Sequence, residues 1–214
     1  PKGGATEAIP GDQLRPKENP EVWTGPGGYF NECMNGFEYQ VAWHMVAEGE
    51  PDSELVRRGL AIIRAIHDRY AADKRNPYNE IECSDHYARS MASYGVFLAC
   101  GGFEYHGPKR RIGFAPKLSP EDFKTPFTAA EGWGTYQQKR GDQGMTAQFT
   151  IRYGRLRLSQ IKLQVPSEKT HVAKVRFDGQ SVEAQCQQTA KDVIIELHPD
   201  VVIQAGQVLT LQLS

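Results

Sequence analysis

Residues 35–48 read NGFEYQVAWHMVAE, a stretch with apolar or aromatic side chains on most sides of a helical wheel. A helix that is apolar nearly all round is normally enclosed by the rest of its protein. Gly49 and Pro51 follow closely, and both residue types mark the end of a helix. The stretch therefore predicts a buried helix over 35–48.

Two more helices are expected downstream of it. Residues 53–72 carry apolar side chains at helical spacing with arginines mostly on the other side, which predicts an amphipathic outer helix that Asp52 is placed to cap. Residues 86–100 (HYARSMASYGVFLAC) are again apolar nearly all round and end at Gly101-Gly102. Buried, amphipathic and buried helices in this order favour an (α/α)6 barrel. Because such a barrel has six helix pairs, three predicted helices indicate only part of one.

After Gly102 the pattern changes to short strands. Residues 103–106 and 112–115 flank Gly107-Pro108-Lys109-Arg110, which predicts a hairpin. The type I′ turn signal Asp178-Gly179 lies among six further strands. These strands are expected at 147–153, 156–165, 172–177, 182–187, 193–197 and 208–213.

The predicted fold class is therefore α+β, a partial (α/α)6 barrel made of its C-terminal helices, followed by a small antiparallel β-sandwich-like segment. The expected domains are a loop or truncated segment at 1–31, the C-terminal part of a barrel catalytic domain at 32–140 and a β-rich domain at 141–214.

The composition excludes several classes of function. The formal net charge is -1, so no basic field favours nucleic acid. No window approaches the length of a membrane span. His and Cys do not fall at zinc spacing, so neither a metal nor another cofactor is predicted.

The densest polar cluster lies between Asn76 and Arg89 and leads into the third helix. It contains Glu80, His86 and Arg89. Carboxylates accept hydrogen bonds from sugar hydroxyls, and arginine donates hydrogen bonds in a fixed fork. Composition alone favours a plainer interpretation, in which Asp85 caps the helix and pairs with Arg89 at i,i+4.

Two smaller clusters also mix polar and aromatic residues. Residues 32–39 (ECMNGFEY) enter the first buried helix, where capping and ordinary core aromatics are an equal alternative to a binding role. Residues 127–134 (FTAAEGWG) place two glycines around Trp133, which allows a close approach of the backbone. A tight junction between the helical and β parts is the favoured interpretation of that second cluster.

Three runs of sequence stand out, which are NPYNEIECSDHYARSMASYGVFLA (76–99), GFEYHGP (102–108) and GFAPKLSPEDF (113–123). They resemble the bacterial branch of glycoside hydrolase family 116, the family of the non-lysosomal glucosylceramidases. The similarity extends from about Glu32 to Tyr136, roughly half of the chain.

The resemblance implies a set of sugar-binding residues. Related enzymes hold glucose with a Glu and an Arg nine residues apart in the first run, which correspond to Glu80 and Arg89. The family also has a Glu-Val-Trp-Thr-Gly motif. A literal copy stands at 21–25, but the distance to the end of the following helix fits 32–36 (ECMNG) instead. This alignment adds Glu32 and places Met34 where relatives carry a sugar-contacting Trp, with His86 expected nearby.

The family consists of retaining β-glycosidases, whose two catalytic carboxylates are expected upstream of this segment. The resemblance thus implies a fragment of a β-glucosidase-type enzyme that supplies part of the sugar-binding wall and acts with the remainder of the same polypeptide on a β-glucoside or related carbohydrate. No catalytic residue is assigned within the chain. A fragment of another (α/α)6 glycosidase or glycoside phosphorylase is an alternative.

A non-catalytic carbohydrate-binding or interaction protein is an alternative from a different class. Exposed aromatic residues on one sheet face would favour it. The strands expected from 147 onwards contain only Phe149, Tyr153 and Phe177 as aromatics, which argues against a stacking platform.

Overall fold

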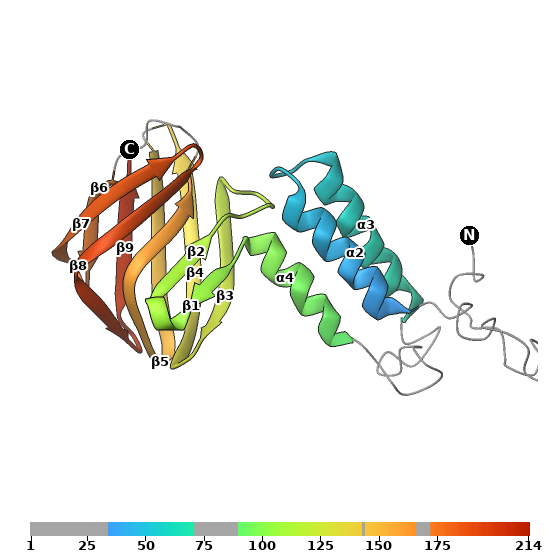
Figure 1. Ribbon diagram of the computed structural model, residues 1–214, viewed down its shortest axis with the longest axis horizontal. Coiled ribbons are helices and arrows are strands. Elements are labelled where there is room, and N and C mark those ends of the chain that lie inside the picture. The colour runs from blue at the N-terminus through green and yellow to red at the C-terminus, as the bar shows by residue number, and fades with distance from the viewer. Residues whose placement is uncertain (1–33, 71–89, 143, 166–171) are drawn as a thin grey trace, which may run out of the picture. The chain divides into compact units, whose positions relative to one another are not determined.

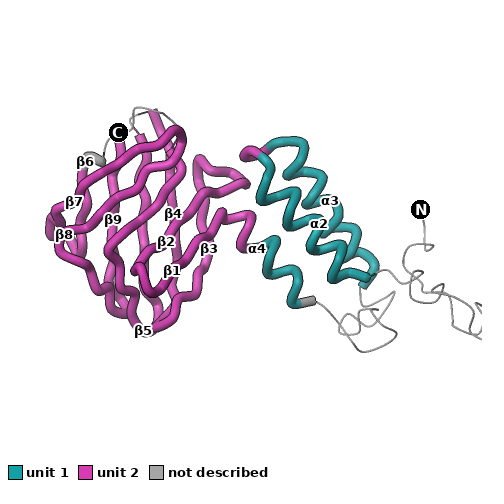
Figure 2. Tube along the Cα trace, viewed as in Figure 1, with its two compact units in different colours: residues 1–49, 53–97 teal, residues 50–52, 98–214 magenta. Residues whose placement is uncertain are grey.

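The computed structural model describes residues 34–70, 90–142, 144–165 and 172–214 (Figure 1). The chain divides into two compact units (Figure 2). The helical unit lies within residues 1–49 and 53–97, and the β unit consists of residues 50–52 and 98–214. Helix α4 (Ser93–Gly101) crosses the boundary between them along the chain.

The helical unit is built on a close pair of helices, α2 (Asn35–Glu48) and α3 (Glu54–Arg69). Their contact depends on Gly59, because a Cβ atom there would lie 2.9 Å from the backbone oxygen of Ala42. Ser53 caps α3 and accepts a hydrogen bond from the amide of Val56 at 3.4 Å. The sequence-based assignment of this cap to Asp52 is therefore wrong.

The predicted helices correspond to observed ones to different degrees. Helix α2 has the predicted bounds, and α3 lies within the predicted range 53–72. The third predicted helix, 86–100, begins outside the described residues. Its described part is a 3₁₀ turn, Ser90–Ala92, followed directly by α4.

The β unit is organised around one long strand, β5, which has 21 residues. Strands β5, β8, β7, β6 and β9 each pair antiparallel with the next, and β9 pairs with β5 again, so these five strands form a closed ring. The ring strands are β5 (Gly144–Gln164), β6 (Val172–Phe177), β7 (Gln180–Thr189), β8 (Asp192–Gln204) and β9 (Val208–Leu213).

Four more strands extend the sheet from opposite halves of β5. Strand β4 pairs with the first half of β5 and carries β3 at its outer edge, while β2 pairs parallel with the second half and carries β1. These strands are β1 (Glu104–His106), β2 (Arg111–Phe114), β3 (Asp122–Ala129) and β4 (Gly132–Gly141). The predicted hairpin around 107–110 is confirmed by the β1–β2 pair.

The core of the β unit contains a cluster of aromatic rings. The rings of Phe114 and Tyr136 stack with their centroids 3.9 Å apart and an interplanar angle of 3°. Phe149 packs beside both. The buried Tyr136 hydroxyl donates to Gln138 Oε1 at 2.7 Å, and Gln138 Nε2 donates to the oxygen of Pro120 at 2.6 Å. This chain of hydrogen bonds satisfies polar groups that would otherwise be costly to bury.

The predicted fold class, a partial (α/α)6 barrel followed by a small sandwich-like segment, is wrong. Strands make up 52% of the described residues, which contain only three short helices, and the ring closes as a five-stranded antiparallel barrel. Residues 104–141, expected to be mostly the end of a helical barrel, form β1 to β4. The strand signal of β3 and β4 was hidden because Pro126 is tolerated on the edge strand β3 and glycines interrupt β4. The β unit reaches back to residue 98, whereas the sequence predicts a domain limit at 140/141.

We expect Gly154→Ala to destabilise the β unit more than Gly179→Ala does. Both glycines have positive φ, +69° and +82°, which costs a residue with a Cβ atom about 1–2 kcal/mol. At Gly154 the new Cβ would also lie 2.1 Å from the oxygen of Glu131, whereas Gly179 has open space. The free energy of unfolding of both variants is measured by urea titration, with near-ultraviolet circular dichroism as the signal. Equal losses would show that the contact with Glu131 does not constrain β5.

Candidate functional site

Of the residues that the sequence assigns to the sugar site, only Met34 is described. Met34 precedes α2, and its carbonyl accepts hydrogen bonds from the amides of Phe37 and Glu38 at 3.0 and 3.2 Å. Its side chain is half-buried and makes no capping hydrogen bond. Glu32, Glu80, His86 and Arg89 lie outside the described residues, so their common cavity stays a prediction.

Glu38, in the polar cluster at residues 32–39, has a structural partner. Arg69 donates to both carboxylate oxygens of Glu38, with Nη1 and Oε1 2.9 Å apart. The side chain of Arg69 is only 9% exposed. Two parallel hydrogen bonds of this kind fix geometry as well as charge. Glu38 therefore ties α2 to α3.

The helical unit leaves large apolar side chains exposed. Phe37 is 60% and Trp43 45% exposed on α2, although α2 also buries Tyr39. Among the described residues of this unit, the exposed large apolar side chains are Phe37, Val41, Trp43, Leu55, Met91, Tyr94 and Phe97. Exposed apolar side chains add surface that packing against another body would bury.

In the β unit, one side of the sheet forms a continuous polar surface that we call the outer face. Residues paired directly across antiparallel strands point to the same side, so the register defines its rows. The outer face consists of four rows across β3, β4, β5, β9 and β6. The rows are Thr128, Trp133 and Tyr153; Pro126, Thr135, Thr150 and Val208; Lys124, Gln137, Gln148, Thr210 and Arg176; and Asp122, Lys139, Thr146, Gln212 and Lys174.

Two aromatic rings occupy one end of the outer face. Trp133 on β4 and Tyr153 on β5 are register partners and are 49% and 67% exposed. The glycines on either side of Trp133 explain its position. A Cβ atom at Gly132 would lie 2.3 Å from the oxygen of Tyr153, and one at Gly134 would lie 2.3 Å from the oxygen of Thr150. The two glycines thus allow β4 to approach β5 closely, and alternation along β4 places the Trp133 side chain on the outer side.

A carboxylate holds two arginines next to this aromatic pair. Arg155 donates to Glu131 Oε1 from Nε at 2.9 Å and from Nη2 at 2.5 Å, and Arg157 Nε donates to Oε2 at 2.7 Å. The hydrogen bond from Arg155, followed by that from Arg157, lowers the pKa of the Glu131 carboxyl. Every second position of β5 from residue 153 on is Tyr153, Arg155 and Arg157. Side chains two positions apart share a face of a strand, so both guanidinium groups lie on the same side as the Tyr153 ring.

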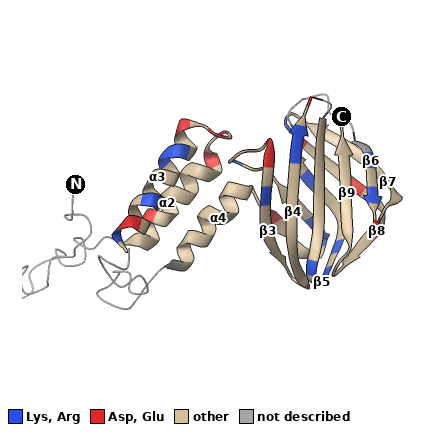
Figure 3. Cartoon of the chain, turned by 180° about the vertical axis from the view of Figure 1, so that it is seen from behind, with Lys and Arg blue, Asp and Glu red and all other residues tan. Residues whose placement is uncertain are grey.

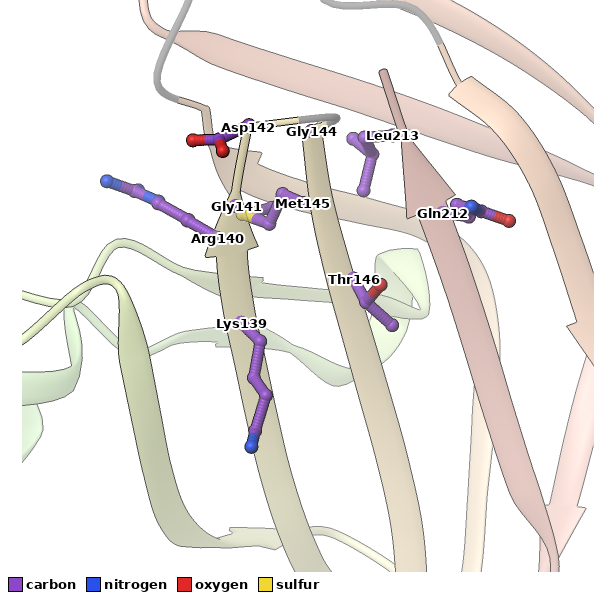
Figure 4. Close-up of a pocket in the computed structure, with 9 residues that line it drawn as sticks. All are labelled: Lys139, Arg140, Gly141, Asp142, Gly144, Met145, Thr146, Gln212 and Leu213. Carbon is purple, nitrogen blue, oxygen red and sulfur yellow. The ribbon is translucent and has the colours of Figure 1, made fainter.

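The other end of the outer face is cationic and hollowed. A cavity of about 230 Å³ lies over β5, β9 and β6 and is lined by Thr146, Lys174, Arg176, Thr210 and Gln212. A second cavity, of about 470 Å³, shares Thr146 and Gln212 with it and is also lined by Lys139, Arg140 and Asp142 (Figure 4). Burial lowers the pKa of Arg140, which donates to the oxygen of Gln164 at 3.0 Å.

Basic residues dominate the charge on the outer face. The four rows hold four cations, Lys124, Lys139, Lys174 and Arg176, and one anion, Asp122. Basic positions are visible on this sheet in Figure 3. Lys139 pairs with Asp122, with Nζ and Oδ2 3.7 Å apart. Lys174 and Arg176 form no ion pair with any described residue. The surface is thus positive in a chain whose net charge is -1.

The sequence pattern did not lead to this surface. Trp133 falls in a cluster predicted to be a junction between the helical and β parts, but residues 127–134 form the hairpin of β3 and β4 instead. Tyr153 is one of the three aromatic residues in the predicted strands, a number that argued against a stacking platform. The usable signal was Gly-Trp-Gly, because glycines on both sides of an aromatic residue allow close strand packing beneath an outward ring.

Two further observations concern the described residues only. They contain no group of three or more His, Cys, Asp or Glu side chains that could hold a metal ion. None of their helices has both the length and the apolar character that crossing a membrane requires.

Comparisons with known proteins find structural likeness among solved structures but no match by sequence. No protein-family model matches the chain, and no curated protein matches it. The chain is similar to the solved α-L-rhamnosidase of Dictyoglumus thermophilum, with 12% identity and a TM-score of 0.33. The match covers 57% of this chain and 13% of the rhamnosidase, so the chain spans a small part of that enzyme. A TM-score of this size defines no common fold.

We expect Trp133→Ala and Tyr153→Ala to leave stability within about 0.5 kcal/mol of the parent chain, since exposed side chains contribute little to it. Tyr136→Ala removes a fully buried ring and should cost about 3–5 kcal/mol. Urea unfolding of the three variants tests this contrast. A large loss for either exposed ring would assign that ring to the fold and remove it from the candidate site.

Proposed function

We propose that this chain is part of a retaining β-glycosidase similar to family 116 glycoside hydrolases. In this proposal the chain contributes groups that hold the sugar, and the catalytic nucleophile and general acid/base belong to another part of the same polypeptide. A retaining mechanism needs two carboxyl groups about 5–5.5 Å apart on either side of the scissile bond. The substrate is a β-glucoside or a related carbohydrate.

The observation that carries the proposal is the pair Glu80 and Arg89, nine residues apart within the run at 76–99. A carboxylate can accept from two neighbouring sugar hydroxyls, and a guanidinium group donates in a fixed fork to oxygen atoms of the ring substituents. Such a pair orients a pyranose without forming a bond to it. Glu80 is therefore a binding residue in this proposal, separate from the nucleophile.

The apolar exposure of the helical unit also supports the proposal. A chain that holds one wall of a sugar site must pack against the rest of the enzyme. Phe37 and Trp43 on α2, and Met91 just before α4, present apolar surface of the kind that such packing would bury. Burial of apolar area contributes about 25 cal/mol per Å², so this packing would contribute substantially to the stability of the whole enzyme.

In the polypeptide that also carries both catalytic carboxylates, we expect Glu80→Gln to lower kcat/KM by about 10- to 150-fold, the equivalent of a charge-assisted hydrogen bond of about 1.5–3 kcal/mol. Glu82→Gln is the matched control, because Glu82 stands two residues away and has no assigned role. The kcat/KM for hydrolysis of an aryl β-glucoside is measured for the parent enzyme and for both variants. Equal losses for both variants would contradict a specific role for Glu80.

Two further measurements separate binding from catalysis. The 214-residue chain alone should not hydrolyse the aryl β-glucoside, because it lacks the groups for covalent and proton-transfer catalysis. Azide should not restore activity to a Glu80→Ala variant of the complete enzyme. Rescue with inverted product stereochemistry would identify Glu80 as the nucleophile. Cleavage that requires inorganic phosphate would instead favour a glycoside phosphorylase.

A further inference from the structure

The outer face has the composition of a binding surface, and the proposed glycosidase function makes no use of it. Trp133 and Tyr153 project from adjacent strands at one end, and the cavity lined by Lys174 and Arg176 lies at the other. Tyr153 and Thr146 are seven residues apart on β5, a distance of about 20 Å along a strand. The surface is therefore long enough for several units of an extended polymer.

The rows between the two ends are polar and mostly uncharged. Thr135 and Thr150 face each other across β4 and β5, and Gln137 and Gln148 form the next pair. Hydroxyl and amide groups both donate and accept hydrogen bonds, as sugar hydroxyls do. These rows can therefore bind a chain of sugar rings without requiring charge at each unit.

We propose that the outer face binds an acidic polysaccharide, specifically a polymer of uronic acids. The rings of Trp133 and Tyr153 stack on the C–H faces of a pyranose, beside the arginines that Glu131 holds. Lys139, Lys174 and Arg176 bind carboxylates further along the polymer. Arginine suits a carboxylate because its planar fork can donate two parallel hydrogen bonds.

Charge complementarity favours this ligand over a neutral glycan. The outer face has four cations and one anion, and Lys174 and Arg176 have no ion-pair partner among the described residues. A positive surface on a chain with net charge -1 concentrates polyanions at that surface. A neutral polymer could accept hydrogen bonds from these side chains but would gain no charge attraction.

The arrangement of the aromatics favours a polysaccharide over other macromolecules. The fully buried centre of a protein–protein interface is mostly apolar. Trp133 and Tyr153 are bordered instead by Thr128, Thr135 and Thr150. Single-stranded nucleic acid is held by successive rings that stack on successive bases. On the outer face both rings lie in one row, and the other three rows contain no aromatic residue.

The inference uses only residues of the described β unit, so it does not depend on the proposed glycosidase function. The test is binding of the 214-residue chain to polygalacturonate, measured by affinity electrophoresis and calorimetry. The fully methyl-esterified polymer is the matched ligand, because it keeps the sugar backbone and lacks the charge. We expect esterification to weaken binding by about 10-fold or more, since each charged contact is a charge-assisted hydrogen bond.

Variants test the two ends of the outer face separately. Trp133→Ala should weaken binding by about 10-fold, in line with the contribution of a ring that stacks on its ligand. A double variant, Lys174→Gln with Arg176→Gln, should weaken binding and reduce its salt dependence. Lys191→Gln is the matched control, because Lys191 is an exposed cation outside the four rows that pairs with Glu50 at 3.2 Å. It should leave binding unchanged.

Three outcomes would overturn the inference. The first is no binding to polygalacturonate by a chain whose thermal unfolding is that of the native β unit. The second is equal binding of the esterified polymer, or equal binding by the Trp133→Ala variant. The third is competition by a single-stranded oligodeoxynucleotide of matched charge that is as strong as competition by free polygalacturonate, which would assign the outer face to nucleic acid or to polyanions in general.

Discussion

The β unit depends on one constraint, which is that a single strand serves two halves of the sheet. The first part of β5 pairs with β4 and β9, and the later part pairs with β2 and β8. Between the two parts, Gly154 adopts φ +69° at a point where β4 begins. Because the partners change there, β5 connects both halves of the sheet and closes the ring. The outer face and its aromatic end depend on the same strand.

The aromatic core and the exposed aromatic pair reflect the same alternation on β4. Tyr136 points inward, stacks on Phe114 and donates to Gln138, and burial raises its pKa. Trp133 lies three residues earlier on β4, and this odd spacing places its side chain on the opposite face. The register shift between Trp133 and Gly134 sets Trp133 directly opposite Tyr153. The position of the exposed rings is thus fixed by packing beneath them.

Local signals in the sequence predicted local structure well. The apolar run at 35–48 gave the observed helix, and Asp178-Gly179 forms the predicted two-residue turn with positive φ at both positions. Long-range arrangement was not available from such signals. Gly154 looked like a break between strands at 147–153 and 156–165, yet it lies inside one continuous strand. The exposed pair also depends on a register between β4 and β5 that no short motif specifies, and Glu80 and Arg89 were assigned by resemblance alone.

The position of β9 in the ring has a consequence for the folding of the β unit. Strand β9 (Val208–Leu213) pairs with β5 on one side and β6 on the other, although it is the last of the nine described strands in chain order. While a ribosome is still adding these residues, β5 and β6 can only present unpaired edges to the solvent. Unpaired edges bind other strands readily, which leads to aggregation. The ring therefore cannot close before β9 joins it, and until then two strands remain open to pairing with other chains.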